Sequence, residues 1–142
     1  MNWIKVVEWL IGILGSLIVV YCTQLINDRV FVPKNKLKAL LQKVDATISY
    51  YANVISSPGV VNKELELEAS KKLRKIAMRF MAFIAANPKI RERKITHEEL
   101  DSIGPELIRL SNTVGDPLMG EKNVEKLELI RKLLYKNNPR AV

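Results

Sequence analysis

The longest apolar stretch of the chain lies near its N-terminus. From Trp9 to Asn27 there are 19 consecutive residues without a charged side chain, and ten of them are Leu, Ile or Val. As an α-helix this stretch would be about 28 Å long, which matches the hydrocarbon core of a bilayer. Ten such residues favour insertion by roughly 3 to 6 kcal/mol in total. The pattern predicts one transmembrane helix over about residues 9–27, within an N-terminal anchor formed by residues 1–29.

Three other interpretations of this stretch have to be weighed. A cleavable signal peptide would have a shorter apolar core and small residues before the cleavage site, whereas residues 20–24 read VYCTQ. Acylation of Cys22, as in a lipoprotein, would require a small residue where Tyr21 stands. The core helix of a soluble protein would carry polar residues along one face, and this stretch has few on any face. We therefore favour a retained anchor.

The rest of the chain, residues 30–142, has the apolar spacing of amphipathic helices. After Pro33, apolar residues recur at steps of three and four as far as Ile55, and Ser56–Gly59 ends this first helix. A second helix is expected from a cap at Asn62 to about Asn87–Pro88. Its apolar stripe consists of Leu65, Ala69, Leu73, Ile76, Ala77, Phe80, Phe83 and Ile84.

Two further helices are expected in the C-terminal third. Thr96 and Glu99 have the spacing of a capping box, which predicts a helix start. Gly104–Pro105 is expected to divide that helix and to leave residues 105–114 as a separate turn of helix. The last helix is expected over about residues 123–136. Since alternation with a period of two does not persist anywhere, the fold class predicted for the chain is all-α, a transmembrane helix followed by a cytoplasmic bundle of four or five helices.

The distribution of charge along the chain predicts which side of the membrane each end of the chain lies on. The chain of 142 residues has a formal net charge of +8 and a mean hydropathy of +0.01. Residues 29–94 contain 15 Lys or Arg and five Asp or Glu, whereas residues 95–142 contain seven Lys or Arg and eight Asp or Glu. Because Lys and Arg are retained on the cytoplasmic side of a membrane, the N-terminus is expected outside and residues 30–142 in the cytoplasm. The location expected is the inner (plasma) membrane of the cell.

The basic residues that follow the span are candidates for contact with anionic lipid, since juxtamembrane Lys and Arg are attracted to an anionic leaflet. These residues are Arg29, Lys34, Lys36, Lys38 and Lys43. Nucleic-acid binding through residues 71–94 is the weaker alternative, because no recognition motif accompanies the charge and few aromatic residues are present for stacking. A solvated face that serves only topology is the third interpretation, and it stays open.

The span itself has a spacing of small residues that permits close contact between helices. Gly12 and Ser16 are four residues apart, and Gly15 is adjacent to Ser16. This spacing is compatible with a homo-oligomer formed through the span. It is also common in helices that do not associate, so both interpretations stay open.

Few residues could carry catalysis or a cofactor. His97 is the only histidine and Cys22 the only cysteine, and no nucleophile motif, metal-ligand spacing or Gly-rich phosphate loop accompanies them. The position four residues after His97 is Asp101, so the zincin spacing is incomplete. We expect a protein that is not an enzyme and needs no cofactor.

Three stretches resemble a group of small, uncharacterised bacterial membrane-anchored proteins that have one N-terminal span and a helical cytoplasmic region. The stretches are residues 71–88, 106–114 and 123–134, and Leu110–Ser111–Asn112 is the least generic part of them. The resemblance implies this architecture and a bacterial inner membrane, and it implies no activity. The function expected is a membrane-anchored interaction module, a scaffold, regulator or accessory subunit, that binds a protein not identified by the sequence. The alternative is a small membrane-active effector, of the toxin or phage-defence type, that acts through oligomerisation of its span.

Overall fold

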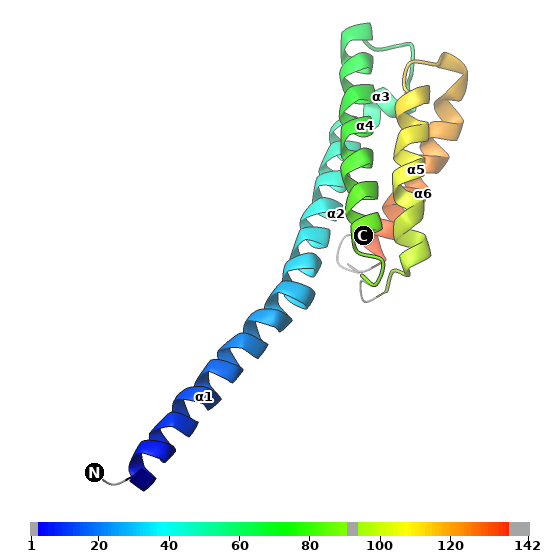
Figure 1. Ribbon diagram of the computed structural model, residues 1–142. Coiled ribbons are helices and arrows are strands. Elements are labelled where there is room, and N and C mark those ends of the chain that lie inside the picture. The colour runs from blue at the N-terminus through cyan, green and yellow to red at the C-terminus, as the bar shows by residue number, and fades with distance from the viewer. Residues whose placement is uncertain (1–2, 91–93, 137–142) are drawn as a thin grey trace. The chain divides into compact units, whose positions relative to one another are not determined.

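A computed structural model describes residues 3–90 and 94–136, and these residues form helices and the turns that connect them (Figure 1). No strand occurs within these two ranges. The prediction of an all-α protein is therefore confirmed. The chain divides into two units, Met1–Asn35 and Lys36–Val142.

The first unit is dominated by the helix α1, Trp3–Ile26, which has no buried residue. The stretch Asn27–Phe31 (η1) has π-helical geometry, and the Val32 N–H donates to the carbonyl of Asn27. Pro33 follows directly, and a proline interrupts the regular ladder because it lacks an N–H group. One helix in the described part of the chain is long and apolar enough to cross a membrane. It contains an 18-residue window with a mean hydropathy of 2.0, none of which is buried by other residues.

The second unit is a bundle of antiparallel helices with one hydrophobic core. Its elements are α2 (Val32–Tyr50, from Lys36 on), α3 (Ala52–Ser56), α4 (Lys63–Ala86), α5 (His97–Thr113), η2 (Pro117–Met119) and α6 (Gly120–Tyr135). The four long helices alternate in direction, as Figure 1 shows for α4, α5 and α6. Fully buried side chains come from each of them, for example Ile48, Phe80, Leu107 and Ile130. Burial of these apolar faces drives the assembly of the bundle.

Two of the predicted helix starts are confirmed in detail. The side chain of Asn62 accepts a hydrogen bond from the Glu64 N–H at 3.0 Å, so Asn62 caps α4. Thr96 and Glu99 form a complete capping box at the start of α5, with bonds of 3.2 Å and 2.9 Å. These caps satisfy backbone N–H groups that have no partner inside the helix.

The predicted division of the next helix at Gly104–Pro105 is wrong, because α5 is continuous from His97 to Thr113. A proline disfavours helix in the preceding residue through clashes with that residue's N–H group and Cβ, and Gly104 has no Cβ. Asp101 and Pro105 are both exposed, so water can reach the carbonyl that Pro105 leaves without a partner. Burial of the apolar residues on both sides of Pro105 then favours a single helix.

Two helix boundaries also differ from those expected. The helix predicted to continue to Ile55 ends at Tyr50, and Tyr51 forms a turn before the short helix α3. This turn brings the Tyr51 ring into the core, where only 4% of the residue is exposed. The last helix begins at Gly120, three residues before the expected Asn123, because η2 leads directly into it.

Candidate functional site

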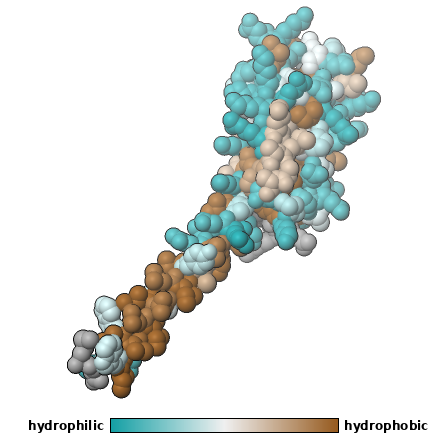
Figure 2. Space-filling view, in the orientation of Figure 1, coloured by the Kyte–Doolittle hydropathy of each residue, from teal (hydrophilic) through white to brown (hydrophobic). Residues whose placement is uncertain are grey.

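The surface of α1 is apolar and uncovered. Hydrophobic residues cover α1 in the space-filling view, whereas hydrophilic residues predominate on the visible face of the bundle (Figure 2). The two hydroxyl side chains of α1 are satisfied within the helix. Ser16 donates to the Ile13 carbonyl and Thr23 to the Val19 carbonyl, both at 2.8 Å. Such internal bonds remove the cost of placing a hydroxyl group in lipid.

The small residues of α1 lie on an open surface. A Cβ atom added at Gly12 or at Gly15 would have no neighbouring atom within 4 Å. Ser16 is exposed as well. These three residues are therefore accessible to a neighbouring helix, and among the described residues Ser16 is hydrogen-bonded only within α1. Cys22 is exposed and carries a free thiol.

The five basic residues that follow the span are all exposed. Arg29 lies in η1 and Lys34 in the first turns of α2, and both belong to the first unit. Lys36, Lys38 and Lys43 belong to the second unit, where they lie outside the buried stripe of α2. This exposure leaves their charges free to act on a surface outside the bundle.

Two tyrosines join α2 to the rest of the bundle, and sequence periodicity did not identify these contacts. The Tyr135 hydroxyl donates to Asp45 Oδ1 at 2.9 Å, and the Tyr51 hydroxyl donates to Glu68 Oε1, also at 2.9 Å. Burial, reinforced by Glu68, raises the pKa of Tyr51 to about 12. The bond to Asp45 and burial raise the pKa of Tyr135 as well. Both hydroxyls therefore keep their protons at neutral pH.

Polar contacts also connect α4, α5 and α6. The Ser70 hydroxyl donates to the carbonyl of Ser111 and the Arg74 guanidinium donates to Asn112 Oδ1, both at 2.6 Å. In Leu110–Ser111–Asn112, the Ser111 backbone and the Asn112 side chain thus contact α4, whereas the Ser111 hydroxyl donates to the Ile108 carbonyl within α5. Asn123 is fully buried, and its amide bonds both the hydroxyl and the carbonyl of Thr113.

One ion pair joins α5 to α6 at the end of the bundle where α5 begins and α6 ends. Lys136 Nζ lies 2.6 Å from Glu99 Oε1, and the second oxygen of Glu99 accepts from the Thr96 N–H. The hydrogen bond from Lys136, followed by that from the Thr96 backbone, lowers the pKa of Glu99. Glu99 therefore serves both the helix cap and the contact with α6.

His97 lies beside this ion pair in the chain and is half-buried. Its Nδ1 atom is enclosed and has no hydrogen-bond partner among the described residues. No group of three or more His, Cys, Asp or Glu side chains in residues 3–90 and 94–136 has the geometry to hold a metal ion.

Comparisons with protein-family models, with curated proteins and with solved structures find no match to this chain.

Proposed function

We propose that the chain is a single-span protein of a bacterial inner membrane, with its N-terminus outside and its helical bundle in the cytoplasm. The bundle acts as an interaction module, that is, as a scaffold, regulator or accessory subunit that binds another protein. It performs no catalysis and requires no cofactor. The bacterial location rests on the resemblance of residues 71–88, 106–114 and 123–134 to small membrane-anchored proteins.

The contrast between the two units carries this proposal. The large apolar residues of α1 are exposed, for example Trp9 at 74% and Ile18 at 62%. The bundle, in contrast, encloses a core of fully buried Leu, Ile, Val and Phe side chains. Since contiguous exposed apolar surface of this extent is unstable in water, α1 requires an apolar environment from outside the chain. The excess of Lys and Arg after the span supports the orientation.

Membrane extraction tests the location. We expect the full chain to stay in the membrane fraction after an alkaline carbonate wash. Leu14→Arg together with Leu17→Arg should release it, because each Arg at the centre of a span costs about 3 kcal/mol of insertion free energy. Leu67→Arg is the matched control, since Leu67 is 56% exposed on α4 in the other unit. A wild-type chain that is soluble without detergent would contradict the proposal. A reporter fused to the C-terminus and active only outside the cell would contradict the orientation.

The accessible small residues of α1 favour a second candidate, a membrane-active effector whose span oligomerises. The two functions differ in their effect on cells. An effector depolarises the cells that overexpress it, and Gly12→Leu, which places a bulky side chain on the contact surface, relieves the effect. Overexpression of an interaction module leaves the membrane potential unchanged. Leu10→Phe is the control for the substitution, because Leu10 lies on the side of α1 away from the small residues.

A further inference from the structure

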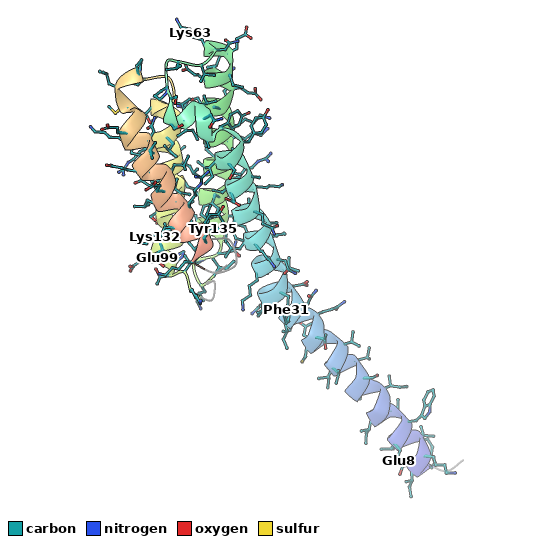
Figure 3. All side chains as sticks on the ribbon, turned by 180° about the vertical axis from the view of Figure 1, so that it is seen from behind. Glu8, Phe31, Lys63, Glu99, Lys132 and Tyr135 are labelled. Atoms are coloured by element: carbon teal, nitrogen blue, oxygen red, sulfur yellow. The ribbon has the colours of Figure 1, made fainter. Side chains whose placement is uncertain are left out.

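The fold gathers basic residues from four segments at one end of the bundle. Antiparallel packing places the start of α2, the end of α4, the start of α5 and the end of α6 at this end. The contacts Tyr135–Asp45 and Lys136–Glu99 fix α6 against α2 and α5 here, and Tyr51–Glu68 fixes the opposite end of α2. Figure 3 shows Glu99, Lys132 and Tyr135 near one end and Lys63 at the other. We call the first the basic end; its Lys and Arg residues in the described chain are Lys36, Lys38, Lys43, Lys89, Lys94, Arg131, Lys132 and Lys136.

The two ends of the bundle differ in the balance of charge. The described residues of the basic end, 36–48, 80–90, 94–105 and 129–136, contain eight Lys or Arg and four Asp or Glu. The opposite end together with the middle of the bundle, residues 49–79 and 106–128, contains nine Lys or Arg and eight Asp or Glu. Two of the four carboxylates at the basic end are engaged, since Asp45 accepts from Tyr135 and Glu99 accepts from Lys136. Most of the excess of positive charge in the described bundle therefore lies at the basic end.

Chain connectivity restricts which surface the basic end can meet. Asn27 ends the apolar stretch, and Lys36 begins the second unit only nine residues later. Even a fully extended segment of this length spans no more than about 30 Å, so an inserted α1 keeps the start of α2 close to the leaflet. The opposite end is separated from Lys36 by the remaining length of α2, about 20 Å of helix. The basic end is thus the end of the bundle with the shorter covalent connection to the span.

We propose that the basic end of the bundle docks on the anionic leaflet of the membrane that α1 anchors. This inference rests on the proposed membrane location and extends the lipid contact from α2 to residues of the α4–α5 connection and α6. Lys38, Lys89 and Lys132 are exposed and come from three different segments. Each such residue beside an anionic leaflet favours the docked state by about fivefold. Docking holds the opposite end, with its exposed Val60 and Leu118, toward the cytoplasm.

The test uses the full chain in nanodiscs made of zwitterionic lipid alone or with anionic lipid added. Cys22→Ser removes the native thiol, and Ala85→Cys, in the last turn of α4, places a donor dye at the basic end. Acceptor dye on the lipid headgroups then reports how close this end lies to the bilayer. We expect more energy transfer on anionic than on zwitterionic discs at about 0.1 M salt, where the Debye length is about 10 Å. The difference should vanish at about 1 M salt, where that length is about 3 Å. A dye at Ser57→Cys, near the opposite end, should show no such gain.

Matched triple variants assign the effect to the basic end. Lys38→Glu with Lys89→Glu and Lys132→Glu should lower the ratio of docked to undocked bundle by about 100-fold or more and abolish the gain. Lys63→Glu with Lys71→Glu and Lys122→Glu changes the net charge equally at the opposite end and should retain the gain. If the first triple variant unfolds, the corresponding Gln substitutions and the salt dependence of the wild type provide the same comparison.

Several outcomes would overturn the inference. The inference is wrong if the inserted wild type shows equal energy transfer on both kinds of disc. It is also wrong if both triple variants lose the increase in energy transfer on anionic discs to the same extent. A labelled nucleic acid serves as the competing ligand. If the basic-end triple variant loses binding to the nucleic acid but keeps the increase in energy transfer on anionic discs, the basic end binds nucleic acid and not lipid. A chain that does not incorporate into discs at all contradicts the membrane location instead, so the two failures are distinguishable.

Discussion

The Tyr135 hydroxyl donates a hydrogen bond to the Asp45 carboxylate at 2.9 Å, across 90 residues of chain. Tyr135 is the last residue of α6, and Asp45 lies within α2. The bond therefore joins the C-terminal helix to the helix that follows the proposed anchor. This bond fixes the last turn of α6 at the basic end of the bundle. Lys132 and Lys136 lie in or directly after that turn.

Removal of this bond should destabilise the bundle. Tyr135→Phe keeps the ring and leaves the Asp45 carboxylate without its donor, at a cost of about 1 to 2 kcal/mol of unfolding free energy. Urea unfolding of the full chain in detergent, followed by circular dichroism, measures the change. Tyr50→Phe is the control, because Tyr50 is 75% exposed and its loss of a hydroxyl should change little. An equal effect of the two substitutions would show that the Tyr135 bond does not stabilise α2 against α6.

Tyr51 should make the stability of the bundle sensitive to alkaline pH. Its pKa is raised from 10.0 to about 12 by burial and by the bond to Glu68. The folded state therefore holds the phenol proton more tightly than the unfolded state does. The resulting stabilisation is complete below the unfolded pKa near pH 10 and is lost as the pH rises toward the folded pKa near 12. Tyr51→Phe removes this ionisation.

We expect the wild type to lose more unfolding free energy than Tyr51→Phe between about pH 10 and pH 12. Unfolding curves measured at several pH values in this range provide the comparison. Tyr135 contributes in the same direction, since its pKa is also raised. Parallel pH profiles for the wild type and Tyr51→Phe would refute the prediction, whereas a residual slope abolished by a further Tyr135→Phe substitution would support it.

Local sequence signals predict the helices of this chain better than they predict its contacts. Asn62 and the Thr96–Glu99 pair act on backbone groups within a few residues, so their roles as caps follow from spacing alone. The contact of Asp45 with Tyr135 depends on the packing of two helices that are distant in sequence. The predicted break at Gly104–Pro105 was wrong for the same reason, because the core contacts of α5 outweigh the local preference of these two residues against helix. The basic residues at the start of α2 were identifiable from the sequence, but the contribution of α6 to the basic end required the antiparallel arrangement of helices.

Asn123 should be essential for the connection between α5 and α6. It is fully buried, and its side chain bonds the Thr113 hydroxyl at 2.6 Å and the Thr113 carbonyl at 3.1 Å. Asn123→Ala leaves both groups without this partner, and we expect a loss of about 2 to 3 kcal/mol in unfolding free energy. Asn53→Ala, at an exposed position of α3, should change stability by less than about 0.5 kcal/mol. Thermal unfolding of both variants distinguishes a buried polar contact from a general effect of removing an amide.

Gly104 should tolerate no larger side chain while Met81 remains in place. A Cβ atom at Gly104 would overlap Met81 Cγ and lie 3.0 Å from the Met81 sulfur, so α4 and α5 approach each other closely at this point. Gly104→Val forces Met81 to change its position, and overpacking of this kind costs about 1 to 3 kcal/mol. Met81→Ala introduced in the same chain removes the obstructing atoms and should restore the part of the stability that this overlap costs. The cost of a Cβ directly before Pro105 remains.

A double-mutant cycle on Gly104 and Met81 measures this coupling directly. Gly115→Ala is the control glycine substitution, because the nearest atom to its added Cβ, Glu66 Oε2, lies at an ordinary distance of 3.6 Å. If the effects of Gly104→Val and Met81→Ala simply add, the two residues do not limit the approach of α4 and α5. If Met81→Ala instead restores stability to the Gly104→Val variant, the close approach of α4 and α5 is one reason that a glycine precedes Pro105. The other reason is that a residue without a Cβ keeps α5 continuous at this proline.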